Sequence, residues 1–177
     1  MGFCLGIDVG GTGALVALSH RHKVLLMERM PMRKLDLTHA EVDACRLREL
    51  IDSLASEGAV GPDLVVIEKV GPVPGSSRKG AFTFGRHYQA LLTLCELEGW
   101  PHELVQAQAW KGEVLAGTDR SKQAAMDWAT RTFGLDPPLT HDGLGDAFCM
   151  AELAWRRCYG SQGRQERKRR GVKDESE

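Results

Sequence analysis

Four acidic residues, from three distant segments, have the type and spacing to bind metal ions. Asp8 and Glu68 each directly follow a short apolar run, and Asp142 and Asp146 lie four positions apart near the start of another apolar segment. A carboxylate at the end of a buried strand is costly unless it is paired or bound to a cation. These positions therefore call for a chemical explanation.

The expected arrangement brings the four carboxylates together. If the strands before Asp8 and Glu68 are parallel neighbours, the two acids lie side by side at the carboxyl edge of the sheet, where α/β proteins bind ligands. Asp142 and Asp146 share one face of a helix and would repel each other there. Four such groups would need divalent cations, and two cations ~4 Å apart are a common device for in-line attack on phosphate esters. The pattern therefore predicts a two-metal site.

Simpler roles remain open for two of the acids. Asp8 could cap the glycine-rich turn that follows it, because aspartate side chains bond to nearby backbone in turns. Asp142 could be favoured by the dipole at the start of its helix. Neither role accounts for Asp146.

The elements that would hold these acids follow an α/β order. Apolar, β-prone runs separated by short polar turns favour a three-stranded antiparallel meander, and two later runs favour two more strands. Helical periodicity and capping residues predict the helices between and after them. The expected strands are Phe3–Val9, Ala14–Ser19, Val24–Met30, Leu64–Ile67 and His102–Gln106, and the expected helices run from a capping box at Thr38 to Gly58, from Ala81 to Glu98, from Ser121 to Phe133 and from Asp142 to Tyr159.

The segment Val70–Gly80 is rich in glycine, proline and serine and predicts a flexible basic loop directly after Glu68. Arg78, Lys79 and Gly80 could contact DNA phosphates there, and Phe82 could stack on an unpaired base.

The ordered motifs resemble those of the RuvC-like Holliday-junction resolvases, most closely the chloroplast-type and viral branch. They are Gly6-Ile7-Asp8, Val66-Ile67-Glu68, Gln108-Ala109-Trp110-Lys111 and Asp142 with Asp146-Ala147, and they span about residues 3–155.

The resemblance implies a ribonuclease-H-like fold with a mixed five-stranded sheet, and a homodimer that cuts two opposed strands of a four-way DNA junction with two Mg²⁺ or Mn²⁺ ions per site. It also implies that Asp8, Glu68, Asp142 and Asp146 hold the metals, and that Lys111 or Lys122 assists catalysis.

Two features depart from that family. Many bacterial members place the last two acids three apart, and the run Gly10–Gly13 is unusually rich in glycine. The segment Gly6–Thr12 is also similar to the first phosphate-binding turn of sugar kinases and actin-like ATPases, in which backbone amides hold phosphate. A phosphate-binding domain of that class and a non-catalytic junction-binding protein are therefore alternatives.

Composition limits the class of protein. The chain is 42% hydrophobic and 27% charged, a composition typical of globular proteins. Its 177 residues are enough for one domain. We expect a nuclease domain over residues 1–160, a basic, disordered tail over residues 161–177, reduced cysteines and a cytoplasmic location. The expected helix over residues 81–98 has more apolar residues than one side of a small sheet needs, so we expect it to form the dimer contact.

Overall fold

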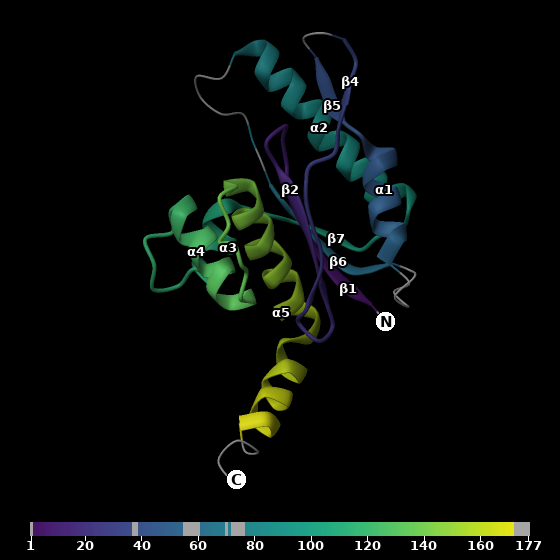
Figure 1. Ribbon diagram of the computed structural model, residues 1–177. Helices are drawn as coiled ribbons and strands as arrows, with labels where there is room; N and C mark the ends of the chain where they lie inside the picture. Colours follow the sequence, from purple (N-terminus) through teal and green to yellow (C-terminus); the bar gives the residue numbers. More distant parts are fainter. Residues whose placement is uncertain (1, 37–38, 55–60, 70, 72–76, 172–177) are drawn as a thin grey trace.

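The centre of the molecule is a mixed five-stranded sheet. The computed structural model describes residues 2–36, 39–54, 61–69, 71 and 77–171, with side chains as far as Gly160. The sheet has the order β3-β2-β1-β6-β7 (Figure 1). β1 is antiparallel to β2, and β2 to β3, whereas β1, β6 and β7 are parallel neighbours. The strands are β1 (Phe3–Asp8), β2 (Ala14–Ser19), β3 (Val24–Arg29), β6 (Pro62–Glu68) and β7 (His102–Val105). The meander with two added parallel strands is therefore confirmed.

Helices cover both faces of this sheet, and Figure 1 shows α3, α4 and α5 on one side with α1 and α2 on the other. The close packing of α5 on β1 depends on Gly6. A β-carbon at Gly6 would lie 2.2 Å from the backbone nitrogen of Ala151 and 2.3 Å from the carbonyl oxygen of Ala147. The helices are α1 (Ala44–Ser53), α2 (Arg78–Leu97), α3 (Ala107–Val114), α4 (Lys122–Phe133) and α5 (Asp142–Gly171).

The prediction for the first helix was wrong at its start. Residues near Thr38, which itself lies outside the described residues, belong to a hairpin of β4 (Met32–Lys34) and β5 (Ala40–Val42). The helix begins only at Ala44, and the Asp43 side chain accepts a hydrogen bond from the backbone of Arg46 at its first turn. Asp43 is therefore the capping residue that the sequence pattern had assigned to Thr38.

The expected basic loop is shorter than predicted. Ser77 caps α2 by accepting a hydrogen bond from the Gly80 amide, so Arg78, Lys79 and Gly80 form the first helical turn instead of loop. Residues 70 and 72–76 of the expected loop lie outside the described residues.

Two further helical features differ from expectation. The short helix α3, which contains the Gln108–Lys111 motif, was not expected as a helix. Helix α5 continues to Gly171 instead of ending at Tyr159, because the segment is rich in Gln, Glu, Lys and Arg, which are good helix formers. The division at residue 160 and the disordered tail stay predictions.

The cysteines of the chain are free, as expected. In the part of the chain that the structure describes, no helix is both long and apolar enough to cross a membrane.

Candidate active site

Asp8 and Glu68 lie side by side at the carboxyl edge of the sheet. β1 and β6 are parallel with Ile7 opposite Ile67, so the two acids that follow them are neighbours across the ladder. The amino end of α5 closes over them. A β-carbon at Gly143 would lie 2.5 Å from the Thr12 carbonyl oxygen and 3.0 Å from the Asp8 carboxylate. Glycine at position 143 therefore lets α5 approach Asp8 closely.

The crowding of carboxylates changes the ionisation of Asp8. Burial, followed by the charges of Asp146 and Glu68, raises the pKa of Asp8 from its usual 3.8 to about 7. Burial and the nearby Asp146 also raise the pKa of Glu68. Like charges in a poorly solvated site cannot all ionise unless a cation compensates them. Asp8, Glu68 and Asp146 thus form one electrostatically coupled group.

Asp146 supplies the most direct sign of a missing partner. Its side chain is buried, and Oδ1 has no hydrogen-bond partner among the described residues. Burial raises the pKa of Asp146, while the charges of Lys111 and Lys122 oppose that rise. A buried carboxylate oxygen without a donor is unfavourable unless a ligand or ion satisfies it. The donor set therefore fits a hard cation, which prefers carboxylate oxygens.

Asp142 is held differently from the other three acids. Its carboxylate pairs with the Lys122 ammonium group and accepts a hydrogen bond from the Gly143 amide at 2.9 Å. The Lys122 hydrogen bond keeps the pKa of Asp142 below its usual value. His141 accepts a hydrogen bond from the Leu144 amide, which is a capping role. Asp142 is therefore ionised but engaged with lysine.

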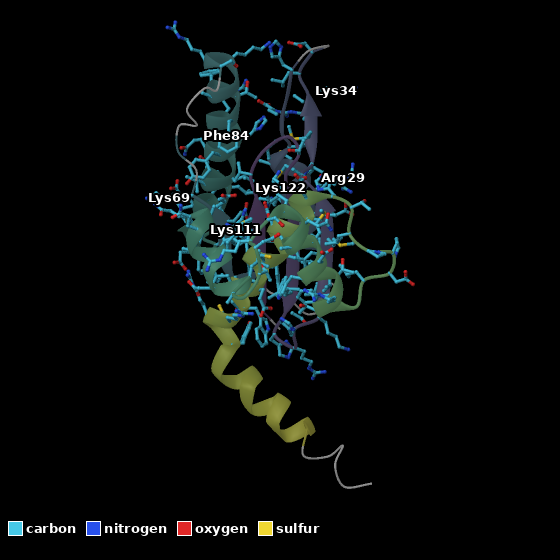
Figure 2. The ribbon with its side chains drawn as sticks, turned by 90° about the vertical axis from the view of Figure 1, so that its left-hand side faces the viewer. Arg29, Lys34, Lys69, Phe84, Lys111 and Lys122 are labelled. Carbon is cyan, nitrogen blue, oxygen red and sulfur yellow. The ribbon has the colours of Figure 1, made fainter. Side chains whose placement is uncertain are left out.

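Lys111 and Lys122 both approach the acid group. The charges of both lysines oppose the rise in the pKa values of Glu68 and Asp146. The Lys111 ammonium group also lies 5.1 Å from the centre of the Trp110 ring, which anchors α3 in the core. Figure 2 shows the two lysines near the middle of one face of the molecule. The structure thus brings all six predicted catalytic side chains to one end of the sheet.

The acids do not form a closed metal cage in this conformation. Within the described ranges, no group of three or more His, Cys, Asp or Glu side chains has the arrangement of a metal site. Asp142 is bonded to Lys122. Burial raises the pKa values of the other three carboxylates. Binding of a cation would therefore require Asp142 to exchange its lysine partner for the ion.

The predicted DNA-contact residues lie apart from this group. Arg78, Lys79 and Gly80 are exposed at the start of α2, and Phe82, two positions beyond Gly80, is 71% exposed. Phe84 packs against the core, as the sequence pattern predicts, and also lies 3.8 Å from the β-carbon position of Gly10. The first turn of α2 is therefore accessible on the surface, and its contact with DNA stays a prediction.

Sequence reasoning did not single out Arg29 or Lys69. Both side chains are exposed, and Figure 2 shows them on opposite sides of Lys111 and Lys122. Lys69 directly follows Glu68, so its position could have been noted from the sequence. The position of Arg29 depends on the strand register and could not.

Comparison with known proteins identifies the fold. No family model matches the chain, and no curated protein matches it. Among solved structures, a Thermus thermophilus RuvC in complex with Holliday junction substrate is 18% identical with a TM-score of 0.63, over 92% of this chain and 97% of that one. A second T. thermophilus RuvC structure is 19% identical with a TM-score of 0.62, over 89% and 96%. The chain thus has the ribonuclease-H-like fold of RuvC, as the order of its motifs indicated.

Proposed function

We propose that the protein is a structure-selective DNA endonuclease that resolves four-way junctions by paired, metal-dependent hydrolysis of phosphodiester bonds. The observation that carries the proposal is the convergence of Asp8, Glu68 and Asp146 in one coupled group, with Asp142 beside them. This group lies at the carboxyl edge of a sheet that has the RuvC fold. One of the similar RuvC structures contains a Holliday junction substrate, which supports DNA junctions as the substrate class.

In this proposal the four acids hold two Mg²⁺ or Mn²⁺ ions. Such ions activate a water molecule and stabilise the charge that develops on the phosphate. The carboxylates of Asp8 and Asp146 must lose their protons to serve as ligands. The raised pKa of Asp8, about 7, places its deprotonation near neutral pH, and burial raises the pKa of Asp146 as well.

The two lysines have separate roles in this proposal. Lys122 neutralises Asp142 in the metal-free protein and would release it for metal binding. The ion pair is exposed, so little free energy is needed to break it. Lys111 has no such ion pair among the described residues. It can therefore approach the phosphate and stabilise its charge.

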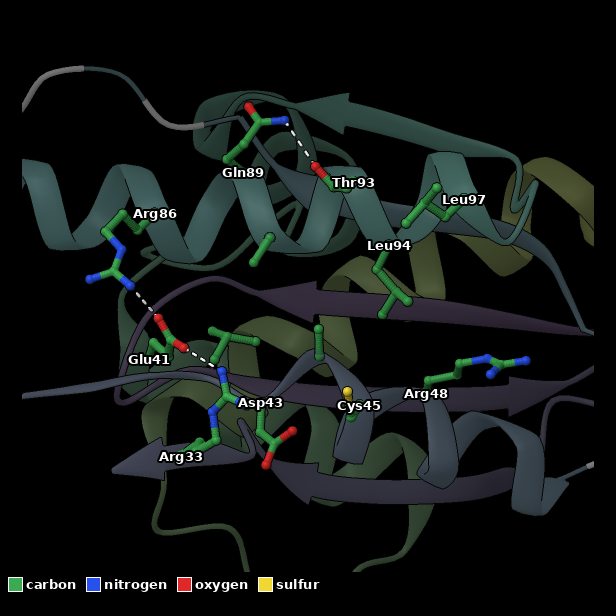
Figure 3. Close-up of a pocket in the computed structure, with 13 residues that line it drawn as sticks. Arg33, Glu41, Asp43, Cys45, Arg48, Arg86, Gln89, Thr93, Leu94 and Leu97 are labelled. Carbon is green, nitrogen blue, oxygen red and sulfur yellow. Dashed lines mark hydrogen bonds and ion pairs between the residues drawn. The ribbon is translucent and has the colours of Figure 1, made fainter. Parts of the chain in front are cut away.

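A homodimer would present two such sites to two symmetric strands. A groove of ≈ 590 Å³ lies between α1, α2 and the β4–β5 hairpin (Figure 3). Leu94 and Leu97 of α2 line it, and Leu97 is 79% exposed. Phe82 is also exposed, but it lies near the other end of α2 and outside the groove. An exposed apolar side chain that lines a groove indicates an interface. We propose that a second copy of the chain covers this face.

Incubation with a synthetic four-way junction, a fork and a duplex in Mg²⁺ tests the function. The wild type should nick two opposed strands of the junction symmetrically and leave the duplex intact. Asp146→Asn should lower the cleavage rate by several orders of magnitude while binding persists, because metal-assisted chemistry provides most of the acceleration. The exposed Asp52→Asn on α1 is the matched control and should cut normally.

The alternative functions predict different results. Junction binding without nicking in Mg²⁺ or Mn²⁺ would indicate a non-catalytic junction-binding protein, and sugar-dependent ATP turnover would indicate the kinase class. Replacement of Mg²⁺ by Ca²⁺ should allow binding without efficient cutting, because Ca²⁺ coordinates more loosely and at longer distance.

The dimer has its own test. Sedimentation at micromolar concentration should give a dimer for the wild type and a monomer for Leu97→Asp, which places a charge on the proposed interface. On a plasmid with a cruciform, the dimer should produce linear DNA by paired cuts. A wild-type monomer would overturn the dimer proposal.

A further inference from the structure

A single row of residues crosses four strands of the sheet through the acid group. Glu68 and Asp8 are neighbours on β6 and β1, Asp8 pairs with Ala14 on β2, and Ala14 pairs with Arg29 on β3. Residues directly opposite one another on neighbouring strands point to the same face of a sheet. Arg29 therefore shares the α5 face with Asp8 and Glu68, and only the small side chain of Ala14 separates it from Asp8 in the row.

The row fixes how far Arg29 lies from the acids. Two strand spacings of ~4.8 Å place the α-carbons of Asp8 and Arg29 ~10 Å apart. Successive phosphates of one DNA strand advance about 3.4 Å along the duplex axis. For a DNA strand that runs along this row, a phosphate at the acid group therefore has a neighbour beside Arg29 within about three nucleotides.

The charge of Arg29 is available for such a contact. Arg29 is exposed and forms no ion pair with any residue that the structure describes. Nearby Arg33 differs, because its guanidinium group pairs with Glu41 at 2.6 Å, and Arg86 pairs with the same carboxylate. Charges that are already neutralised contribute little to phosphate binding, whereas Arg29 keeps its full charge.

Lys34 extends this positive edge away from the acids. It ends β4, is exposed and has no ion-pair partner among the described residues. Figure 2 shows Arg29 and Lys34 on the same side of Lys122, with Lys34 farther out and with Phe84 and Lys69 on the opposite side. The backbone of Met30 also donates to the Gly13 carbonyl at 2.9 Å, which ties this edge to the turn that follows Asp8.

We infer that Arg29 and Lys34 form a phosphate-binding edge that holds the cleaved DNA strand beside the acid group. Arg29 is a positioning residue that contacts a phosphate within about three nucleotides of the cut, and Lys34 contacts a phosphate farther along the same strand. This inference rests on the proposed function for its substrate, but the edge is distinct from the acids and from the first turn of α2.

The test measures junction affinity as a function of salt concentration, with Ca²⁺ in place of Mg²⁺. Each lost phosphate contact lowers the slope of log affinity against log salt by about 0.9 on B-form DNA. Arg29→Gln and Lys34→Gln should each lower the slope by about that amount, and the double variant by about twice as much. Arg29→Lys should restore the wild-type slope.

The control removes the same charge elsewhere. Arg46 lies on α1 and is paired with Glu49 at 2.9 Å, so Arg46→Gln should leave the salt slope unchanged. Circular dichroism and thermal unfolding of Arg29→Gln should match the wild type, because the side chain is exposed. If Arg29→Gln is folded and has the same salt slope as the Arg46→Gln control, the inference is overturned.

A chemical substitution in the DNA locates the contact. Neutral methylphosphonate linkages are introduced one at a time within three nucleotides of the cut. One of these linkages should weaken DNA binding by the wild type as much as the Arg29→Gln substitution does. The same linkage should not further weaken DNA binding by the Arg29→Gln variant. If none does, Arg29 does not hold that strand. If the wild type binds with an Arg29-dependent slope but never nicks, the proposed function fails while this binding edge stands.

Discussion

Asp8 should make the metal-free protein less stable at neutral pH than at acidic pH. Its pKa is about 7 in the folded protein and about 3.8 in the unfolded chain. Well below pH 3.8, Asp8 is protonated in both the folded and the unfolded state, so its ionisation does not change the free energy of unfolding. As the pH rises toward 7, the unfolded state releases the proton and the folded state keeps it, so the folded state loses stability until the penalty is complete above pH 7.

The size of this penalty follows from the pKa difference. About three pKa units correspond to ~4 kcal/mol at 1.36 kcal/mol per unit, which is an upper bound because Glu68 and Asp146 titrate with Asp8. Asp8→Asn removes the charge and should raise the free energy of unfolding by ~2–4 kcal/mol at pH 8 in EDTA. A domain of this size should then melt roughly 5–15 °C higher.

Urea unfolding of wild type and Asp8→Asn at pH 4, 6 and 8 measures this effect. The difference should be near zero at pH 4, grow through pH 6 and reach its maximum at pH 8. Mg²⁺ should stabilise the wild type at pH 8 and have little effect on Asp8→Asn, because ligand binding to the folded state adds stability. Asp52→Asn should change stability by less than about 0.5 kcal/mol at each pH. An Asp8→Asn protein that is no more stable than wild type at pH 8 would refute the assignment of Asp8 to a crowded carboxylate group.

Three other substitutions test the packing that supports the site, each by urea unfolding. Gly6→Ala should cost about 3 kcal/mol or more and also abolish junction cleavage, because the added β-carbon pushes the helix that holds Asp146 off β1. Glu152→Gln should cost ~3 kcal/mol without changing the cleavage position, since the buried Glu152 carboxylate binds His22 and Arg156. Ser77→Ala should cost about 1 kcal/mol by removing the α2 cap.

The positions of the acids could be predicted because they depend on local patterns. Asp8 and Glu68 end runs whose apolar character already indicates buried strands, and parallel neighbours bring such ends together. The partner of Asp142 could not be predicted in this way. Lys122 begins α4 and reaches Asp142 only because α4 packs on α5, so the ion pair depends on tertiary packing.

The capping-box error has a similar cause. A threonine three positions before a glutamate favours a helix start on local grounds. In the structure, Glu41 is in β5 and binds Arg33 across the hairpin and Arg86 on α2. These contacts with other segments favour a strand at Glu41, and the helix begins after Asp43 instead. Long-range ion pairs of this kind leave no periodic signal in the sequence.

The position of Arg29 shows how one irregular residue can decide which side chain reaches a site. At the end nearest the turn between β2 and β3, Leu18 pairs with Val24, and a regular hairpin continued from there would place Glu28 opposite Ala14. The register instead shifts between Ala17 and Leu18, so that Ala14 pairs with Arg29. Since neighbouring residues of a strand point to opposite faces, a shift of one residue exchanges an acid for a base in the row that contains Asp8. The bulge thereby places a positive charge, in place of a fifth carboxylate, beside a site that is proposed to bind phosphate.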